Sequence, residues 1–389
     1  MLNEKITPQL EELLAAKNYR AIKALLNGLT PQDIALLLDG AEESDVSLLF
    51  RLLPKELAAE TFVEMDSDLQ RRLLRSFSDA ELRSVVAELF VDDVADIIEE
   101  MPANVVKRIL ASADAETRAA VNEILHYPPD SAGSIMTTEY ISLSADMTVE
   151  DAFTRIRRVG VDKETIYTCY VTAPDRRLIG LVTVKTLLLS DKATAVGHIM
   201  ERNVISVRTD ADRELVAQEL GRYDFLAMPV TDAENRLVGI VTFDDAIDVI
   251  REEATEDIEK MAAITPTDKP YLKTGVFETF GKRIPWLCLL MISATFTGSI
   301  IAHFEDALAK AVILTAFIPM LMDTGGNAGS QASVTVIRGL SLGELSMRDI
   351  FRILWKELRV ALLCGAALAA LGFAKLLLFD RVSLRVALV

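Results

Sequence analysis

The sequence has few of the residues that build catalytic and redox centres. Its 389 residues include three cysteines and three histidines, and none of these stand at C-x-x-C or H-x-x-x-H spacing. We therefore predict neither a disulfide framework nor a zinc site. The sequence also lacks P-loop spacing and a recognisable nucleophile–base arrangement, so we do not expect an enzyme.

Positive charge is also scarce. Lys and Arg number 41 against 58 Asp and Glu, which gives a net charge of −17. Binding to nucleic acid needs clustered basic residues that replace counterions, so we exclude nucleic acid as a partner. Residues 1–30 lack a basic stretch followed by an apolar one, so we expect no signal peptide and a cytoplasmic N-terminus.

Hydrophobic residues make up 51% of the chain and are unevenly distributed. Charged residues crowd positions 1–260, whereas long apolar runs occupy 284–302, 311–337 and 360–379. Each run is long enough to cross a hydrocarbon core of about 30 Å. Lys282 and Arg283 flank the first run, which places that end in the cytoplasm. We predict a multi-pass α-helical domain over 276–389, in the lipid bilayer of the cell inner membrane.

The second apolar run contains a proline, three glycines, Asp323 and Asn327. Proline and glycine at membrane depth allow a broken helix that lines a water-filled path. Close helix packing through small residues explains the glycines equally well. An acid within a membrane span is a functional candidate by default, so Asp323 and Asn327 are pore candidates.

Residues 1–130 have apolar side chains at helical spacing, for example Leu10, Leu13 and Leu14. Prolines at 8, 31, 54 and 102 separate short amphipathic segments. We predict a superhelical stack of helix pairs in an N-terminal domain.

Residues 131–250 contain an internal repeat. Ser134-Ile135-Met136 matches His198-Ile199-Met200 after an interval of 64 positions, and the run 179–183 matches 238–242. Each unit is predicted as strand, helix, strand, strand, helix. The pattern resembles a tandem CBS-domain pair, with repeat 1 at 131–195 and repeat 2 at 196–250. In adenosine-binding pairs a Thr and an Asp hold the ribose, and here they would be Thr242 and Asp245.

Residues 244–275 are predicted as an acidic connecting helix. At about 100° per residue, one face carries five carboxylates. These are Asp245, Asp248, Glu252, Glu256 and Glu259. Ile247, Ile250 and Ile258 lie on the opposite face. Like charges at this spacing destabilise a helix, and a divalent cation such as Mg²⁺ would neutralise them. A solvated charged face is the alternative.

Taken together, these features resemble the MgtE family of magnesium channels over essentially the whole chain. The fold class is then a multidomain α and α/β membrane protein, with a helical N domain, a CBS pair, an acidic "plug" helix and a transmembrane domain. The resemblance implies a homodimer in which cytoplasmic Mg²⁺ bridges the three soluble parts and closes the pore. The metal-binding acids that it implies are Glu60, Asp92, Asp96, Asp212, Glu214, Asp224, Asp245, Asp248, Glu253, Glu256 and Asp257.

Several alternatives remain open at this point. The transported ion is Mg²⁺ or, with the same gate, Co²⁺, Mn²⁺ or Zn²⁺. A membrane-anchored sensor of ATP would use Thr242 and Asp245 instead. The resemblance implies five transmembrane helices, of which three fall within this sequence, so we expect an intact sensor and an incomplete pore.

Overall fold

The computed structural model describes residues 2–267, 271, 273–309, 312, 315, 317–378 and 384. It divides into two compact units, residues 1–250 and 251–389. The first unit holds the N domain and the CBS pair, and the second begins inside the acidic helix and holds the apolar helices.

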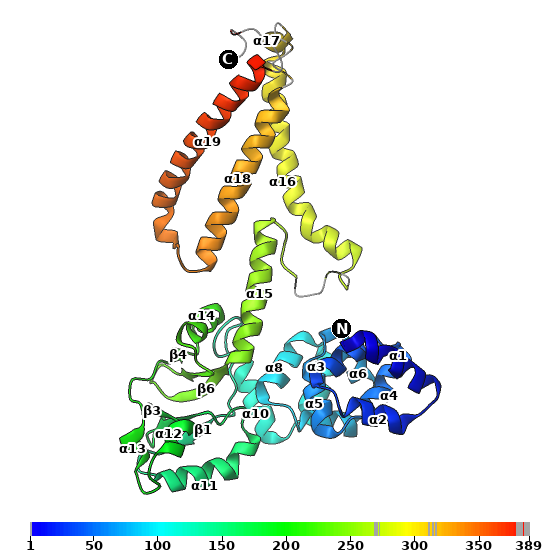
Figure 1. Ribbon diagram of the computed structural model, residues 1–389, viewed down its shortest axis with the longest axis vertical. Helices are drawn as coiled ribbons and strands as arrows, with labels where there is room; N and C mark the ends of the chain where they lie inside the picture. The colour runs from blue at the N-terminus through cyan, green and yellow to red at the C-terminus, as the bar shows by residue number, and fades with distance from the viewer. Residues whose placement is uncertain are drawn as a thin grey trace. The chain divides into compact units, whose positions relative to one another are not determined.

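The N domain consists of ten short helices that pack around one apolar core (Figure 1). Alternate helices touch, because α1 contacts α3, α3 contacts α5, α5 contacts α7, and α7 contacts α9. This confirms the superhelical stack. The bounds are α1 Leu2–Ala15, α2 Tyr19–Leu26, α3 Pro31–Asp39, α4 Glu43–Arg51, α5 Lys55–Val63, α6 Ser67–Ser76, α7 Asp79–Val86, α8 Val91–Glu100, α9 Ala103–Ser112 and α10 Ala115–Ile124.

Three of the four prolines lie at helix starts, as predicted. Pro31 is the first residue of α3, and Pro54 and Pro102 are the N-caps of α5 and α9. The prediction is wrong at Pro8, which lies inside α1. Packing of α1 on α2 and α3, with Leu10 buried, offsets the missing backbone hydrogen bond.

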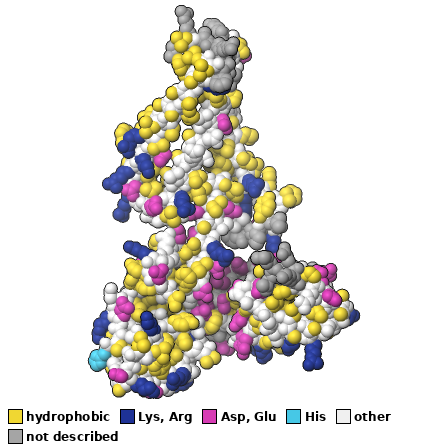
Figure 2. Space-filling view, in the orientation of Figure 1, with side chains coloured by type: hydrophobic (Ala, Val, Ile, Leu, Met, Phe, Trp, Pro, Cys, Tyr) yellow, Lys and Arg dark blue, Asp and Glu magenta, His cyan; other side chains and the backbone are white. Residues whose placement is uncertain are grey.

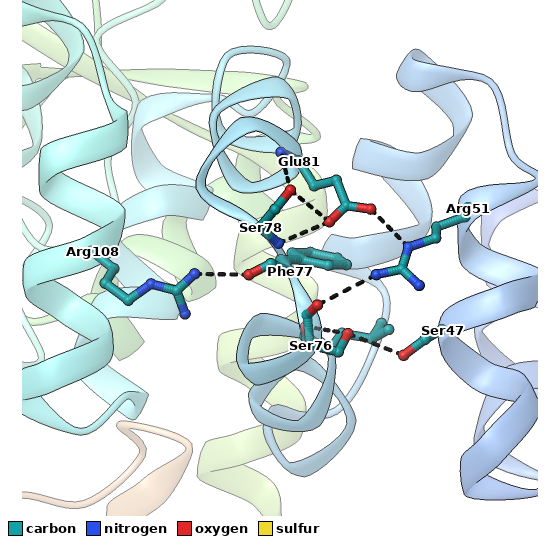
Figure 3. Close-up of polar contacts among 8 residues, drawn as sticks. Ser47, Arg51, Ser76, Phe77, Ser78, Glu81 and Arg108 are labelled. Carbon is teal, nitrogen blue, oxygen red and sulfur yellow. Dashed lines mark hydrogen bonds and ion pairs between the residues drawn. The ribbon is translucent and has the colours of Figure 1, made fainter.

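Polar contacts join α4, α6, α7 and α9 around residues 76–78 (Figure 3). Arg51 Nε lies 2.7 Å from Glu81 Oε1, and Ser78 forms a capping box with Glu81 at the start of α7. Arg108 Nη2 donates to the carbonyl oxygen of Phe77 at 2.8 Å. The Glu81 carboxylate therefore stabilises the packing of these helices.

The CBS pair consists of two copies of the predicted strand–helix–strand–strand–helix unit. In each copy the first two strands are parallel and the last two antiparallel. The bounds in repeat 1 are β1 Ile141–Leu143, α11 Val149–Val159, η1 Gly160–Asp162, β2 Thr168–Thr172, β3 Leu178–Thr183 and α12 Val184–Leu189. Those in repeat 2 are α13 Val196–Ile199, β4 Val207–Arg208, α14 Arg213–Tyr223, β5 Ala227–Thr231, β6 Leu237–Thr242 and α15 Phe243–Met261.

In each repeat, a methionine near the start packs closely against a glycine in the last strand of the other repeat. A Cβ on Gly239 of β6 would lie 2.6 Å from Met136 Sδ, at the start of repeat 1. A Cβ on Gly180 of β3 would likewise lie 2.6 Å from Met200 Sδ, at the start of repeat 2. Each copy therefore closes over a strand of the other, and glycine is needed where they meet.

The acidic helix α15 begins at Phe243, close to the predicted start at 244, but ends at Met261, well before the predicted end at 275, and its core-facing side also differs from the prediction. Ala246 and Val249 are buried against repeat 2, whereas Ile247 and Ile250 are 40% and 46% exposed. The predicted apolar face was therefore displaced by one residue, because the strand β6 that leads into α15 fixes which side meets the sheet.

The second unit contains the long apolar helices α16 Val276–His303, α18 Phe317–Ser341 and α19 Ile350–Leu378, with short α17 Glu305–Ala309 and η3 Met347–Asp349. Two segments, Val276–His303 and Met347–Leu378, are long and apolar enough to cross a membrane. They include the first and most of the third predicted spans. Part of the second predicted span, at 311, 313, 314 and 316, lies outside the described residues.

The predicted break in the second span is not found in α18, which is one continuous helix from Phe317 to Ser341. Pro319 falls in its first turn, where a missing amide donor costs nothing. The glycines remain inside the helix, each at a cost of about 1 kcal/mol relative to alanine.

Candidate cation site

Six carboxylates gather where the N domain meets the CBS pair, and we call them the interdomain acidic cluster. Asp92 and Asp93 begin α8, Asp244 and Asp245 begin α15, and Glu139 and Glu164 come from loops of repeat 1. Figure 2 shows Asp and Glu side chains gathered on this part of the soluble surface. The cluster thus joins the N domain to the helix that leads into the second unit.

Burial and mutual repulsion raise the pKa values of four members of the cluster, namely Asp92, Asp93, Glu164 and Asp245. Burial raises the pKa of Asp92 well above its usual value, with Asp245 as the next cause. Burial, followed by the charge of Asp245, raises the pKa of Asp93 to about 7 and of Glu164 to about 8. Burial also raises the pKa of Asp245 to about 6. Negative charge is therefore costly here unless a proton or a cation compensates it.

No member of the cluster forms an ion pair with Lys or Arg within the described part of the chain. Asp92 is 8% exposed, and its Oδ1 atom is buried without a hydrogen-bond partner among the described residues. An unpartnered buried carboxylate oxygen is rare in folded proteins and needs an explanation such as an ion or a water. Asp92 therefore points to a missing ligand.

The chemistry of these donors fits a hard divalent cation. All six side chains offer carboxylate oxygen, which Mg²⁺ prefers, and Mg²⁺ keeps several of its waters when bound. Among the described residues, no three Asp, Glu, His or Cys side chains converge closely enough to enclose one bare metal ion. The arrangement suits a hydrated cation held between α8 and α15 through few direct contacts.

The structure places three further predicted ligands around α14. Asp212 caps the start of that helix through a bond from Glu214 N to its Oδ1 at 2.8 Å, and Asp224 ends it in a left-handed conformation with φ of 53°. Eleven residues separate these ends, which corresponds to about 16 Å at about 1.5 Å per residue. Asp224 therefore cannot share one ion with Asp212 and Glu214 within this chain.

The remaining predicted acids lie on α5, α8 and α15. Glu60 and Asp96 are exposed on α5 and α8. Asp248 adds to the repulsion that acts on Asp245. Along the rest of α15, Glu256 forms an ion pair with Lys260, Glu259 Oε2 accepts from Thr267 N at 2.8 Å, and Glu252, Glu253 and Asp257 follow the helix surface.

Sequence reasoning identified Asp92 and Asp245 but omitted the other four residues of the cluster from the predicted site. Glu139 and Glu164 lie in loops without periodicity, so no helical pattern could select them. One signal was present, because Phe90 precedes α8 and cannot cap it with its side chain. A helix start without its own side-chain cap leaves backbone amides free for water or another acceptor, and at α8 the acceptor is Glu139.

The predicted nucleotide-binding pair is formed in repeat 2. Thr242 Oγ1 donates a hydrogen bond to Asp245 Oδ2 at the junction of β6 and α15. At the same junction in repeat 1, Thr183 Oγ1 and Thr186 Oγ1 lie 3.0 Å apart without a carboxylate. Asp245 therefore belongs both to the nucleotide pair and to the interdomain acidic cluster.

The two pore candidates form a local pair on α18. Asn327 Nδ2 donates to Asp323 Oδ2 at 3.3 Å, one turn apart, and Thr324 Oγ1 donates to the Met320 carbonyl oxygen. The amide satisfies one lone pair of Asp323 and leaves the carboxylate able to accept further bonds. Their place in a pore remains a prediction.

An acidic cluster, a CBS pair and long apolar helices occur together in this chain, and the comparisons with known proteins identify the class as divalent cation transporters. Family models match the MgtE intracellular N domain at residues 29–130, the CBS domain at 132–191 and 196–252, and a divalent cation transporter domain at 318–389. The chain is 38% identical over 378 residues to the magnesium transporter MgtE of Thermus thermophilus, covering 96% of this chain and 84% of that one. The chain therefore belongs to the MgtE family of divalent cation transporters.

Other similarities agree with this assignment. The magnesium transporter MgtE of Bacillus subtilis is 34% identical over 92% of this chain and 79% of its own length. A crystal structure of the cytosolic domain of the Mg²⁺ channel MgtE in complex with ATP is 38% identical, with a TM-score of 0.60 over 62% of this chain and 99% of that chain.

Proposed function

We propose that this protein transports Mg²⁺ across the membrane and that cytoplasmic Mg²⁺ regulates it by binding between the N domain and the CBS pair. The single observation that carries the regulatory part is Asp92, a buried carboxylate with one oxygen that has no hydrogen-bond partner among the described residues, inside a group of acids that form no ion pair there. Transport of Mg²⁺ is supported by the relatives, which are named magnesium transporters.

The regulation follows from electrostatics. Without a divalent cation, the carboxylates of the interdomain acidic cluster repel one another, and this repulsion weakens the docking of α8 beside α15. A bound cation compensates Asp92 and Asp245 together and brings these helices close. Because α15 is one continuous helix from Phe243 to Met261, a change at its first turn is transmitted along the chain toward the membrane helices.

The remaining predicted acids, from Asp212 to Asp257, would bind additional cations along α14 and α15. The homodimer and the choice of Mg²⁺ over Co²⁺, Mn²⁺ or Zn²⁺ stay predictions, since carboxylate ligands alone do not exclude Mn²⁺. Asp323 and Asn327 would line the path of the hydrated ion.

Limited proteolysis of the purified full chain tests the regulation. Mg²⁺ is titrated from zero to tens of millimolar, with K⁺ matched for ionic strength, in the wild type and in Asp92→Asn and Asp248→Ala. Glu116→Ala serves as the control, since it removes an exposed carboxylate of α10 outside the cluster. We expect protection by Mg²⁺ in the wild type and the control, and a loss of that protection in the two variants.

Sensitivity to protease that stays constant across the Mg²⁺ series would contradict the regulation. Transport is tested separately by Mg²⁺ uptake into vesicles that contain the full chain, with empty vesicles as the control. Uptake equal to that of empty vesicles would contradict transport and leave the sensing function standing.

A second candidate function, ATP sensing, is favoured by the Thr242–Asp245 pair and by the relative crystallised with ATP. Asp245 cannot fully satisfy a ribose and a cation between α8 and α15 at once. Protection by ATP in the absence of divalent cations, lost in Thr242→Val, would support this function. Protection from protease by the divalent cation but not by ATP would contradict ATP sensing.

A further inference from the structure

The N-terminus of α8 is capped by a residue from the other domain. Helices α6, α7 and α10 are capped by their own preceding side chains, Asp66, Ser78 and Asp114. The residue before α8 is Phe90, which offers no acceptor. Val91 N instead donates a hydrogen bond to Glu139 Oε2 at 3.1 Å. Glu139 lies 48 positions later in the chain. The N domain thus depends on the CBS pair to complete this helix.

Glu139 is held in place from the CBS side. Thr137 Oγ1 donates to the same Oε2 atom at 2.9 Å, and the backbone N–H of Glu164 donates to the Glu139 carbonyl oxygen at 3.0 Å. Thr137 is fully buried and exchanges both backbone hydrogen bonds with Ile240 of β6, at 2.8 and 2.9 Å. Since β6 leads directly into α15, the start of α8 is tied to the strand that positions Asp245.

This contact acts against the repulsion within the cluster. A carboxylate at a helix N-terminus is stabilised by the free amides and the helix dipole, and it requires no metal. Asp92 and Asp93, which follow Val91 directly, repel Asp245. The bond therefore holds the start of α8 against the loop of repeat 1 that carries Glu139, although the charge of Glu139 itself adds to the repulsion on Asp92 and Asp93.

We propose that Glu139 is a cation-independent latch. Its hydrogen bond to Val91 docks α8 on the CBS pair before a cation arrives, and so it sets the Mg²⁺ concentration at which the two domains close. The docking part stands on the observed contacts, and the effect on Mg²⁺ rests on the proposed function. The competing explanation is that Glu139 contributes only its negative charge to the cluster.

Hydrogen exchange of the full chain in EDTA tests the docking. Glu139→Ala removes the acceptor, whereas Glu139→Gln keeps an oxygen at the same place and removes the charge. We expect faster exchange at Val91 in Glu139→Ala, by about tenfold for the loss of a bond to a charged acceptor, and near wild-type exchange in Glu139→Gln. Equal exchange in the two variants, or no acceleration in Glu139→Ala, would overturn the latch.

The Mg²⁺ dependence separates the two explanations again. Loss of the latch should raise the Mg²⁺ midpoint for protection from protease in Glu139→Ala by about the same tenfold factor, and leave Glu139→Gln near the wild type. Midpoints raised equally in both variants would assign Glu139 a role through charge alone and overturn the proposal. The exchange experiment contains no divalent cation, so its outcome does not depend on whether Mg²⁺ regulates the protein.

Thr137→Val guards against a folding artefact, because it keeps Glu139 and removes only the hydroxyl that anchors it. We expect exchange at Val91 between the wild type and Glu139→Ala, with unchanged exchange in α7. Wild-type exchange at Val91 in Thr137→Val would contradict the anchored arrangement.

Discussion

Two acidic residues of the N domain, Glu81 and Asp93, have opposite electrostatic environments. At the junction of α4 and α7, Arg51 and Ser78 surround Glu81, and hydrogen bonds from Arg51 and then Ser78 lower the pKa of Glu81 to about 2. At the start of α8, burial raises the pKa of Asp93 to about 7. The first contact is complete within the chain. The second has no Lys or Arg counter-charge among the described residues, and we propose a divalent cation in that role.

The largest expected effect comes from breaking the second contact without touching a charge. In Gly239→Ala, the new Cβ would lie 2.7 Å from the Thr137 carbonyl oxygen, so backbone that anchors Glu139 must move. We expect the CBS pair to lose about 1–3 kcal/mol of stability. Hydrogen exchange should accelerate at Val91 and in β6, and stay unchanged around Glu81.

The matched control is Gly221→Ala, since nothing lies within 4 Å of a Cβ on this glycine in α14. It should leave exchange in β6 unchanged or slow it, because alanine is favoured over glycine inside a helix. If Gly239→Ala also left β6 unchanged, the close contact between repeats would not be a determinant of the fold.

The sequence pattern correctly predicted the helices of the N domain and the repeated units of the CBS pair, because both depend on the spacing of nearby residues. Helical spacing gave the N-domain stack, and the 64-residue repeat gave two copies of one strand–helix unit. The side of α15 that faces repeat 2 was predicted wrongly, since Ala246 and Val249 are buried in place of Ile247 and Ile250. The direction in which the chain leaves β6 determines which side of α15 faces repeat 2, and the periodicity of apolar residues gives no information on that direction.

The same limit applies to the site. Asp92 was predicted because the chain resembles a known family at that position, whereas Asp245 was also predicted from its place on the acidic face of a helix. Glu139 and Glu164 reach the cluster through contacts between segments far apart in sequence. Such contacts follow from tertiary structure, and the uncapped helix start at Phe90 was their one trace in the sequence.

Lowering the pH should stabilise the contact at the start of α8 and destabilise the contact around Glu81. Three of the cluster carboxylates have raised pKa values in the docked form, about 7 for Asp93, 6 for Asp245 and 8 for Glu164. The docked form therefore binds more protons, so its stability increases as pH falls and is lost as pH rises through about 6–8. In EDTA, we expect the domains to close when pH is lowered from about 8 to about 6.

Distances between spin labels at Arg72→Cys and Arg157→Cys measure this closure, with the exposed Cys288 and Cys364 replaced by serine. The acidic groups that face each other are Asp92, Asp93, Glu139, Glu164, Asp244, Asp245 and Asp248. Asp93→Asn should shorten the distance at the higher pH and weaken its pH dependence. A distance independent of pH in the wild type would show that these carboxylates do not control docking.

The smallest effect is expected at the completed contact. Glu81 has a lowered pKa, so its contribution is present above its ordinary value of 4.5 and is lost as pH falls toward about 2. The Glu81 side chain is 36% exposed and that of Arg51 49%, so solvent screens the pair. Glu81→Gln, which keeps an acceptor for Ser78, should lower the stability of the N domain by about 1 kcal/mol or less near neutral pH.

Thermal unfolding at low and high salt measures this effect, which should shrink as salt screens the pair. Arg83→Ala, on the same helix and exposed, is the control. Glu81→Gln should leave the distance between the labelled domains unchanged at every Mg²⁺ concentration, because Arg51 already supplies its counter-charge. If it shifted the Mg²⁺ midpoint as strongly as Asp92→Asn, paired and unpaired acids would contribute alike, and the absence of a partner at Asp92 would no longer indicate a cation site.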